Sequence, residues 1–123
     1  MINKFKITNE IRAILLDNSA IKAYVDDRIY PVIAPTSEKG DFIIYQRDGY
    51  KSDRNKMSVT GTAVMVYVFA ISENYDHSAD LASLIYKALN GKFTEPDMLI
   101  QLEDSTEDFS DGRYIQALLF SIE

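Results

Sequence analysis

The segment TAVMVYVFAIS, residues 62 to 72, limits the folds open to this chain more than any other stretch. β-Branched and aromatic residues dominate it, which is typical of a strand because such side chains pack well on a pleated surface. Successive side chains of a strand point to opposite faces of its sheet. Both faces are apolar here: one carries Val64, Val66 and Val68, and the other carries Met65, Tyr67, Phe69 and Ile71. The sheet that holds this strand therefore needs cover on both faces.

The last segment, Arg113 to Glu123, reads as a strand with the same property. One side carries Tyr114, Leu118, Phe120 and Ile122, and the other carries Ile115, Ala117 and Leu119. Antiparallel sheets with one wet face usually alternate cleanly between apolar and polar residues. Two explanations are open. A short helix and a proline-containing segment fold over the second face, or another subunit covers it, since large exposed apolar patches commonly mark interfaces.

Helical periodicity begins near the N-terminus. Apolar residues recur at helical spacing there, at Phe5, Ile7, Ile11, Ile14 and Leu15. Thr8 or Asn3 is the candidate N-cap of this helix. After a break at residues 17–19, Ser19 is expected to cap a short second helix that runs through Val25.

A further helix is predicted from about Tyr75 to Asn90. Its apolar stripe consists of Leu81, Ala82, Ile85, Ala88 and Leu89. Gly91 follows directly and suits a left-handed C-terminal cap, which glycine adopts without a Cβ penalty.

The stretch RIYPVIAPTSEKGDFIIYQR, residues 28 to 47, holds two prolines four residues apart. Proline lacks a ladder donor, so Pro31 and Pro35 cannot lie in the middle of a sheet. We expect RIYPVIAP to form an irregular edge segment, since proline on an edge blocks unwanted strand pairing. A strand from about Asp41 to Arg47 follows, and a long exposed loop over residues 47–61 leads to the strand at 62–72.

With a further strand from Met98 to Glu103, the element order is α, short α, β, β, β, α, β, β. This order predicts the α+β class, with a mainly antiparallel β-sheet and two principal helices packed on one face. The 123 residues fit a single domain, 1–123, because no linker, repeat or low-complexity run divides them.

Composition excludes several classes of function. A net charge of −6 opposes wrapping of duplex DNA, because the field of the whole molecule would repel phosphate. The absence of cysteine excludes disulfides, thiolate nucleophiles and cysteine-type zinc sites. We find no leader-like N-terminus and no apolar run near the ~18 residues of a membrane span, so we expect a soluble protein made in the cytoplasm, with no membrane partner.

Two charged segments of opposite sign are the candidate interaction sites. The predicted loop at 47–61 carries Arg47, Lys51, Arg54 and Lys56, with Tyr50 among them as a side chain able to stack on a base. The segment between the last two strands carries Glu103, Asp104, Glu107, Asp108 and Asp111. We interpret both as solvated loops or as contacts between subunits, where opposite charge would set the register more than the affinity.

Neither segment has the pattern of a known ligand site. The acidic segment lacks the order of an EF-hand loop, and glycine-rich phosphate cradles are missing, so we expect no metal and no cofactor. An acidic patch for a basic partner is the functional alternative for that segment. The single histidine, His77, has Asp76 and Asp80 nearby but no evident nucleophile, and we interpret it as a surface residue. We therefore expect no enzymatic activity and no catalytic residues.

The arrangement resembles the tail-completion, or tail-terminator, proteins of long-tailed bacteriophages and prophages. The resemblance covers nearly the whole chain, and its most individual parts are Arg28-Ile29-Tyr30-Pro31 with Ala34-Pro35, the Phe42–Tyr45 strand and the Leu81–Gly91 helix end. These are patterns of fold and packing, not a catalytic fingerprint.

The resemblance implies a structural role. Members are α+β domains that assemble as rings, commonly hexamers, on the head-proximal end of the tail tube. They stop tube polymerisation and form the surface that joins the head connector. The implied partners are other copies, the tail-tube protein and the head-connector protein. DNA passes through the ring without sequence-specific binding, no cofactor is needed, and the protein resides in the virion tail.

Two other functions remain as alternatives. One is a small non-enzymatic adaptor that binds a different protein through the apolar sheet face. The other, and the weakest, is a small enzyme around His77, Asp76 and the acidic segment, because no nucleophile, metal or phosphate constellation converges there.

Overall fold

The computed structural model describes residues 4–35, 38, 40–52, 62–94 and 97–123. Its helices are α1 (Ile7–Leu16), α2 (Ser19–Val25) and α3 (Tyr75–Leu89), and a 3-10 turn, Lys4–Lys6, precedes α1. Its strands are β1 (Ile29–Pro31), β2 (Phe42–Ser52), β3 (Thr62–Ser72), β4 (Gly91–Thr94), β5 (Asp97–Ser110) and β6 (Arg113–Ile122). None of the described helices is long and apolar enough to cross a membrane.

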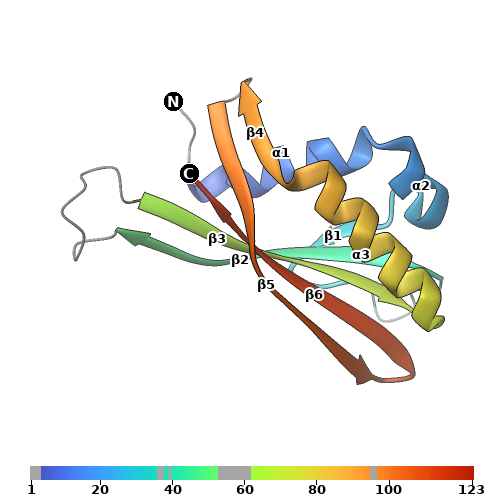
Figure 1. Cartoon of the computed structure of the whole chain (residues 1–123). Helices are drawn as coiled ribbons and strands as arrows, with labels where there is room; N and C mark the ends of the chain where they lie inside the picture. The colour runs from blue at the N-terminus through green and yellow to red at the C-terminus, as the bar shows by residue number, and fades with distance from the viewer. Residues whose placement is uncertain (1–3, 36–37, 39, 53–61, 95–96) are drawn as a thin grey trace.

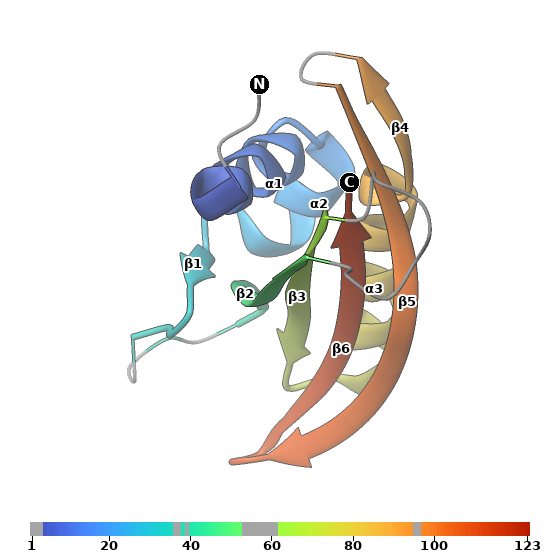
Figure 2. The ribbon, with the colours of Figure 1, turned by 90° about the vertical axis from the view of Figure 1, so that its left-hand side faces the viewer.

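The described strands form one six-stranded sheet in the order β1-β2-β3-β6-β5-β4. Only β1 runs parallel to its neighbour; the other described pairs are antiparallel. The helices lie together on one side of the sheet (Figure 1). Figure 2 shows the sheet curling around them, with β1 at one border and β4 at the other. The predicted α+β class, mainly antiparallel sheet and one-sided helices are confirmed.

The core lies between the helices and the inner face of the sheet. Val64, Val66 and Val68 of β3 are buried beside Leu118, Phe120 and Ile122 of β6, and against them pack Ile11, Leu15, Leu81 and Ile85 from the helices. Burying one such side chain contributes about 1.5–3 kcal/mol. The predicted grouping of alternate residues on each face of these two strands is confirmed, because every second residue joins this core.

The outer face of the sheet has little cover. Met65, Tyr67 and Phe69 of β3 and Ala117 and Leu119 of β6 are half-buried, and the helices lie on the opposite face. Their partial burial follows from the pleated sheet itself, where cross-strand neighbours shield one another.

The proline segment reaches only one end of this outer face. There the Tyr30 ring lies edge-on to Phe42, at 6.3 Å between centroids, and the Arg113 guanidinium lies 5.1 Å over the Phe42 ring. Phe42 and the neighbouring Ile71 are accordingly buried. Of the segments expected to cover the second face, α2 instead packs with the other helices, and the proline segment covers a corner.

Both predicted N-caps need correction. Thr8 lies inside α1, whose N-cap position is Lys6 without a side-chain cap bond, and Asn3 lies outside the described residues. In α2 the cap is Asn18, one residue before Ser19: its side-chain oxygen accepts a 3.0 Å hydrogen bond from the Ile21 N–H. Asparagine caps as well as serine does, so the local sequence alone left the position open by one residue.

The predicted left-handed cap at Gly91 is wrong in detail. The C-cap is Asn90, which is already extended, and Gly91 has a φ of +139° as the first residue of β4. Glycine is needed because no side chain adopts this φ readily, but it carries the chain from helix into strand. Strand β4 was not predicted, since its four residues offer only Phe93 to pack.

Two strands are longer than predicted. β2 continues past Arg47 to Ser52, with a bulge between Arg47 and Gly49, where the exposed loop was expected to have begun. β5 continues past Glu103 to Ser110, so most of the expected acidic loop is strand and the turn falls at Asp111 and Gly112. In both cases a well-formed neighbour, β3 or β6, supplies the hydrogen-bond ladder that a polar sequence does not predict by itself.

The edge position of the proline segment is confirmed. β1 is the border strand, Pro31 is its last residue, and Pro35 lies outside the strands. The Val32 N–H donates to the Tyr45 carbonyl on β2 at 2.9 Å. On the other side of the chain, the Ile29 N–H donates to the Asp27 carbonyl and the Ile33 N–H to the Pro31 carbonyl.

Candidate interaction surfaces

Two hairpins of opposite charge extend from opposite ends of the sheet. At one end, Val64 pairs with Ile122 near the end of β6, and the β2–β3 hairpin continues beyond it to the pair Ser52–Thr62. At the other end, Ser72 pairs with Tyr114, and the β5–β6 hairpin closes beyond it at the pair Ser110–Arg113. We call residues 47–61 the basic arm and residues 103–113 the acidic hairpin. Figure 1 shows the described end of the β2–β3 hairpin and the β5–β6 hairpin at opposite ends of the sheet.

The basic arm is only partly described. The Arg47 guanidinium lies 4.8 Å over the ring of Phe5, a cation–π contact that ties the base of the arm to the N-terminal turn. Tyr50 and Lys51 belong to β2 and pair with Val64 and Ala63. Arg54 and Lys56 lie outside the described residues.

Four of the five acidic residues named from the sequence lie on β5, in different surroundings, and Asp111 lies in the turn. Glu107 faces the helices: one carboxylate oxygen accepts hydrogen bonds from the Tyr75 hydroxyl at 2.5 Å and the Gln116 amide at 2.8 Å. These donors lower the pKa of Glu107, and the same contact with Glu107 raises the pKa of Tyr75. Glu107 thus anchors the hairpin to the first turn of α3.

The other three carboxylates make simpler contacts. Glu103 accepts a 2.9 Å hydrogen bond from the Ser121 hydroxyl. Asp104 and Asp108 each accept from the backbone N–H of the following residue. Through the register, Asp104 pairs with Leu119 and Asp108 with Ile115, which places both aspartates beside the outer face of the sheet. Among the described residues, no group of three or more His, Asp or Glu side chains is arranged to hold a metal ion.

An exposed aromatic cluster surrounds Glu107 and was not predicted. The Tyr114 ring lies 4.8 Å from Phe109 and 5.4 Å from Tyr75, and the side chain of Phe109 is 57% exposed. The signal was present in the segment EDFSDGRY, where alternation of the strand places Glu107 and Phe109 on one face.

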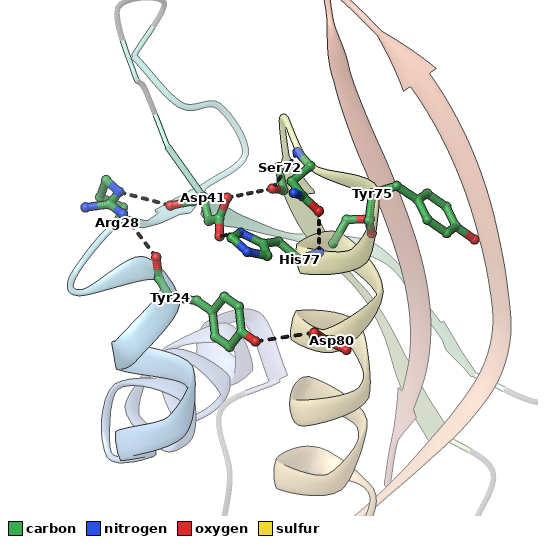
Figure 3. A network of polar contacts seen from close by, with 9 residues as sticks. Tyr24, Arg28, Asp41, Ser72, Tyr75, His77 and Asp80 are labelled. Carbon is green, nitrogen blue, oxygen red and sulfur yellow. Dashed lines mark hydrogen bonds and ion pairs between the residues drawn. The ribbon is translucent and has the colours of Figure 1, made fainter.

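His77 belongs to a polar network that joins three elements (Figure 3). Its Nδ1 lies 3.2 Å from the Asp41 carboxylate, and the Ser72 hydroxyl donates to the other oxygen of the same carboxylate at 2.6 Å. In a catalytic triad the serine would donate to the histidine, which would take its proton. Here serine and histidine both bind the aspartate, so the arrangement does not activate Ser72. Its effect is to fasten α3 to the ends of β2 and β3.

Arg28 fixes the proline segment from the other side of Asp41 (Figure 3). Its Nε donates to the Asp41 carbonyl at 2.9 Å and its Nη2 to the Tyr24 carbonyl at 3.1 Å. Glu38 pairs with Arg28 at 3.7 Å and accepts from the Tyr30 hydroxyl, while its carbonyl accepts from Arg113. Arg28 and Tyr30 of the RIYP motif therefore have a structural role: their side chains hold the proline segment against its neighbours.

Within the proline segment the chain turns sharply at Val32. The φ of Val32 is +65°, a conformation that costs a β-branched residue free energy, and the next N–H closes back on Pro31 at 2.6 Å. Val32 and Ile33 are 62% and 74% exposed. A strained turn thus presents two apolar side chains to solvent.

Comparison with known proteins bears on the fold. No family model matches the chain, and no curated protein matches it in sequence. Among solved structures, it is similar to a chain of the "Virion of native gene transfer agent (GTA) particle", with a TM-score of 0.68 and 12% identity. The match covers 91% of this chain and 89% of the other. The two chains share a fold over nearly their whole lengths.

Proposed function

We propose that this protein is a non-enzymatic structural component of a phage-like virion, located in the tail. The observation that carries the proposal is the fold shared with a chain of the gene transfer agent virion over 91% of this sequence. The elements that gave the resemblance to tail-completion proteins, from the RIYP segment to the α3 helix, are present in this chain as β1, β2 and α3. Among the described residues, the Ser72–Asp41–His77 network does not activate a nucleophile, which is consistent with a structural part.

The finer role is that of a ring at the end of the tail tube. Copies of the chain assemble head to tail, cap the tube and contribute to the junction with the head. Rings of this kind use two different surfaces on each subunit, because a head-to-tail contact repeats until it closes. The basic arm and the acidic hairpin, at opposite ends of the sheet, supply two such surfaces of opposite sign.

The proposed contact residues follow from that geometry. On the arm they are Arg47, Tyr50, Lys51, Arg54 and Lys56; on the hairpin they are Glu103, Asp104, Glu107 and Asp108. The partners are other copies, the tail-tube protein and the head-connector protein. No cofactor, membrane or specific nucleic acid sequence takes part, and the net charge of −6 disfavours a grip on passing DNA.

The test is tube capping. The purified chain is added to the tail-tube protein of the same phage or prophage while the tubes assemble, and tube lengths are measured by electron microscopy. Capping shortens the tubes and leaves a ring at one end. The variant Arg54→Glu/Lys56→Glu should cap poorly, whereas Lys87→Glu/Lys92→Glu, with the same change in charge, should cap normally. Tubes of unchanged length would contradict the proposal.

A second candidate is the adaptor function, favoured by the sparsely covered outer face of the sheet. An adaptor would bind one different protein through Tyr67 and Phe69 without forming rings. Light scattering over a range of concentration separates the two candidates. A mass that grows with concentration supports the ring, and a constant monomer that leaves tubes unchanged supports the adaptor.

A further inference from the structure

The outer face of the sheet is organised in rows across four strands. One row runs Gln46, Tyr67, Leu119, Asp104; the next runs Ile44, Phe69, Ala117, Thr106; the third runs Phe42, Ile71, Ile115, Asp108. We call these twelve residues the open face. The Tyr67 and Phe69 rings stack along it at 5.3 Å between centroids. Its centre is apolar and its β5 border carries two carboxylates, while the Arg113 guanidinium lies over Phe42 at the corner that the proline segment covers.

The basic arm has the complementary composition. Residues 51–60, KSDRNKMSVT, contain Lys51, Arg54 and Lys56 against one acid, Asp53, and add the apolar pair Met57 and Val59. Cations for the aspartate border and apolar side chains for the centre thus occur together within one short segment. Such pairing of charges steers encounter and fixes register, while apolar burial supplies most of the affinity.

The described part of the β2–β3 hairpin extends past the open face of its own copy. The β2–β3 ladder continues to Lys51–Ala63 and Ser52–Thr62, past the last β3–β6 pair at Val64–Ile122. The described chain thus leaves the sheet at Ser52 and re-enters it at Thr62, at the end of the sheet opposite the row that holds Asp108.

We propose that the open face is the docking site for the basic arm of a second copy of this chain. Arg54 and Lys56 of one copy meet Asp104 and Asp108 of the next, and Met57 and Val59 cover the stacked Tyr67–Phe69 pair. The inference rests on the ring of the proposed function and specifies its contact. It also accounts for the two-sided strands, since the neighbour supplies the missing cover.

Cysteine cross-linking tests this contact cleanly, because the natural chain has no cysteine. One variant carries Ser58→Cys on the arm, and another carries Thr106→Cys on the open face. Mixed at the highest soluble concentration and treated with a short bismaleimide, the two should give a cross-linked dimer. The control variant Ser83→Cys, exposed on α3 on the helix side, should not cross-link to the arm. Equal cross-linking to Ser83→Cys, or none to Thr106→Cys, overturns the proposal.

A charge exchange adds specificity. Arg54→Glu/Lys56→Glu in the arm variant should reduce the cross-linked yield several-fold, and Asp104→Lys/Asp108→Lys in the face variant should do the same. Combining the two reversed variants should restore the cross-linked yield. If these residues do not pair, the yield of the combined variants should stay low. Circular dichroism and thermal melts confirm that each variant folds. If tubes are capped but the charge exchange does not restore the yield, the docking site is wrong and the proposed function stands. If cross-linking succeeds but tubes grow to full length, the contact between copies stands and the capping function is wrong.

Discussion

The Asp41 carboxylate and the His77 ring face each other at 3.2 Å, so the residue that precedes β2 is tied to the first turn of α3. The Asp41 carboxylate also accepts a hydrogen bond from the Ser72 hydroxyl, and its backbone carbonyl accepts one from the Arg28 guanidinium. One residue therefore connects the proline segment, the end of β3 and the start of α3.

The first prediction separates the two partners of that contact. Asp41→Ala should lower the free energy of unfolding by about 1–3 kcal/mol, because it leaves the buried Ser72 hydroxyl without its carboxylate acceptor and removes the partner of His77. His77→Ala should cost less than about 1 kcal/mol, because the His77 side chain is 52% exposed and solvent screens its ion pair. Urea unfolding followed by circular dichroism measures both. A larger loss for His77→Ala would contradict the structural role given to Asp41.

The second prediction compares two phenylalanines on opposite faces of the sheet. Phe120→Ala should cost about 3–5 kcal/mol, because Phe120 is fully buried in the core. Phe69→Ala should cost clearly less in the isolated chain, because Phe69 is half-buried on the open face. The same urea titration compares them. Equal losses would mean that the outer face is covered within one subunit.

The third prediction concerns pH. The pKa of Glu107 is lowered in the folded protein, so its contribution to stability is present above the usual value of 4.5 and is lost as pH falls through the folded pKa. The pKa of Tyr75 is raised, so its contribution is present below 10.0 and is lost as pH rises through the folded pKa. Stability should therefore weaken at both extremes.

Two variants isolate these contributions. Glu107→Gln should flatten the acid side of the stability profile below pH 4.5, and Tyr75→Phe should flatten the alkaline side above pH 10. Urea midpoints measured across the pH range give both slopes. An unchanged acid slope in Glu107→Gln would show that another carboxylate governs the acid side.

The fourth prediction addresses the strained turn. Val32→Gly should leave stability unchanged or raise it by up to about 1 kcal/mol, because glycine accepts the φ of +65° and Val32 buries little surface. Val32→Ala keeps the strain and should bring no gain. Thermal melts of the two variants decide the point, and a gain of equal size in both would remove strain as the cause.

The fifth prediction removes part of the basic arm. Deleting residues 53–60, which follow the last β2 residue Ser52 in the chain, should leave the melting temperature of the isolated chain nearly unchanged, because the β2–β3 pairs and the core from Val64 onward are kept. Assembly should be lost, as measured by light scattering and by tube capping. Loss of folding would show that the arm is part of the core of a single copy.

Strong periodic segments were predictable from sequence, and the reason is local. β3, β6 and α3 each carry enough apolar residues at one spacing to define an element and its faces without help. The edge position of RIYP followed from Pro31 alone, because the missing N–H admits few places in a sheet.

Features that depend on a distant partner were not predictable. The second half of β5 consists of polar residues and forms a strand because β6 lies beside it, from Ser105–Leu118 to Ser110–Arg113. The Asp41–His77 contact joins residues 36 positions apart, and sequence placed His77 beside Asp76 instead. The charged segments were identified, but only the register of the sheet places them at opposite ends.

The hydrogen bonds along β1 have a consequence for how large an assembly can become. Residues 29, 31 and 33 point away from β2, and all three lack a free donor: Ile29 donates to Asp27, Pro31 has no N–H, and Ile33 donates to Pro31. The carbonyl groups of an added strand would find no free N–H donor on these three residues of β1. The sheet therefore cannot be extended there into a fibre. In the proposed ring, copies would join by faces and hairpins instead, each turned by the same angle from the last. Such an assembly ends at a fixed number of subunits when the rotation brings the last copy back to the first.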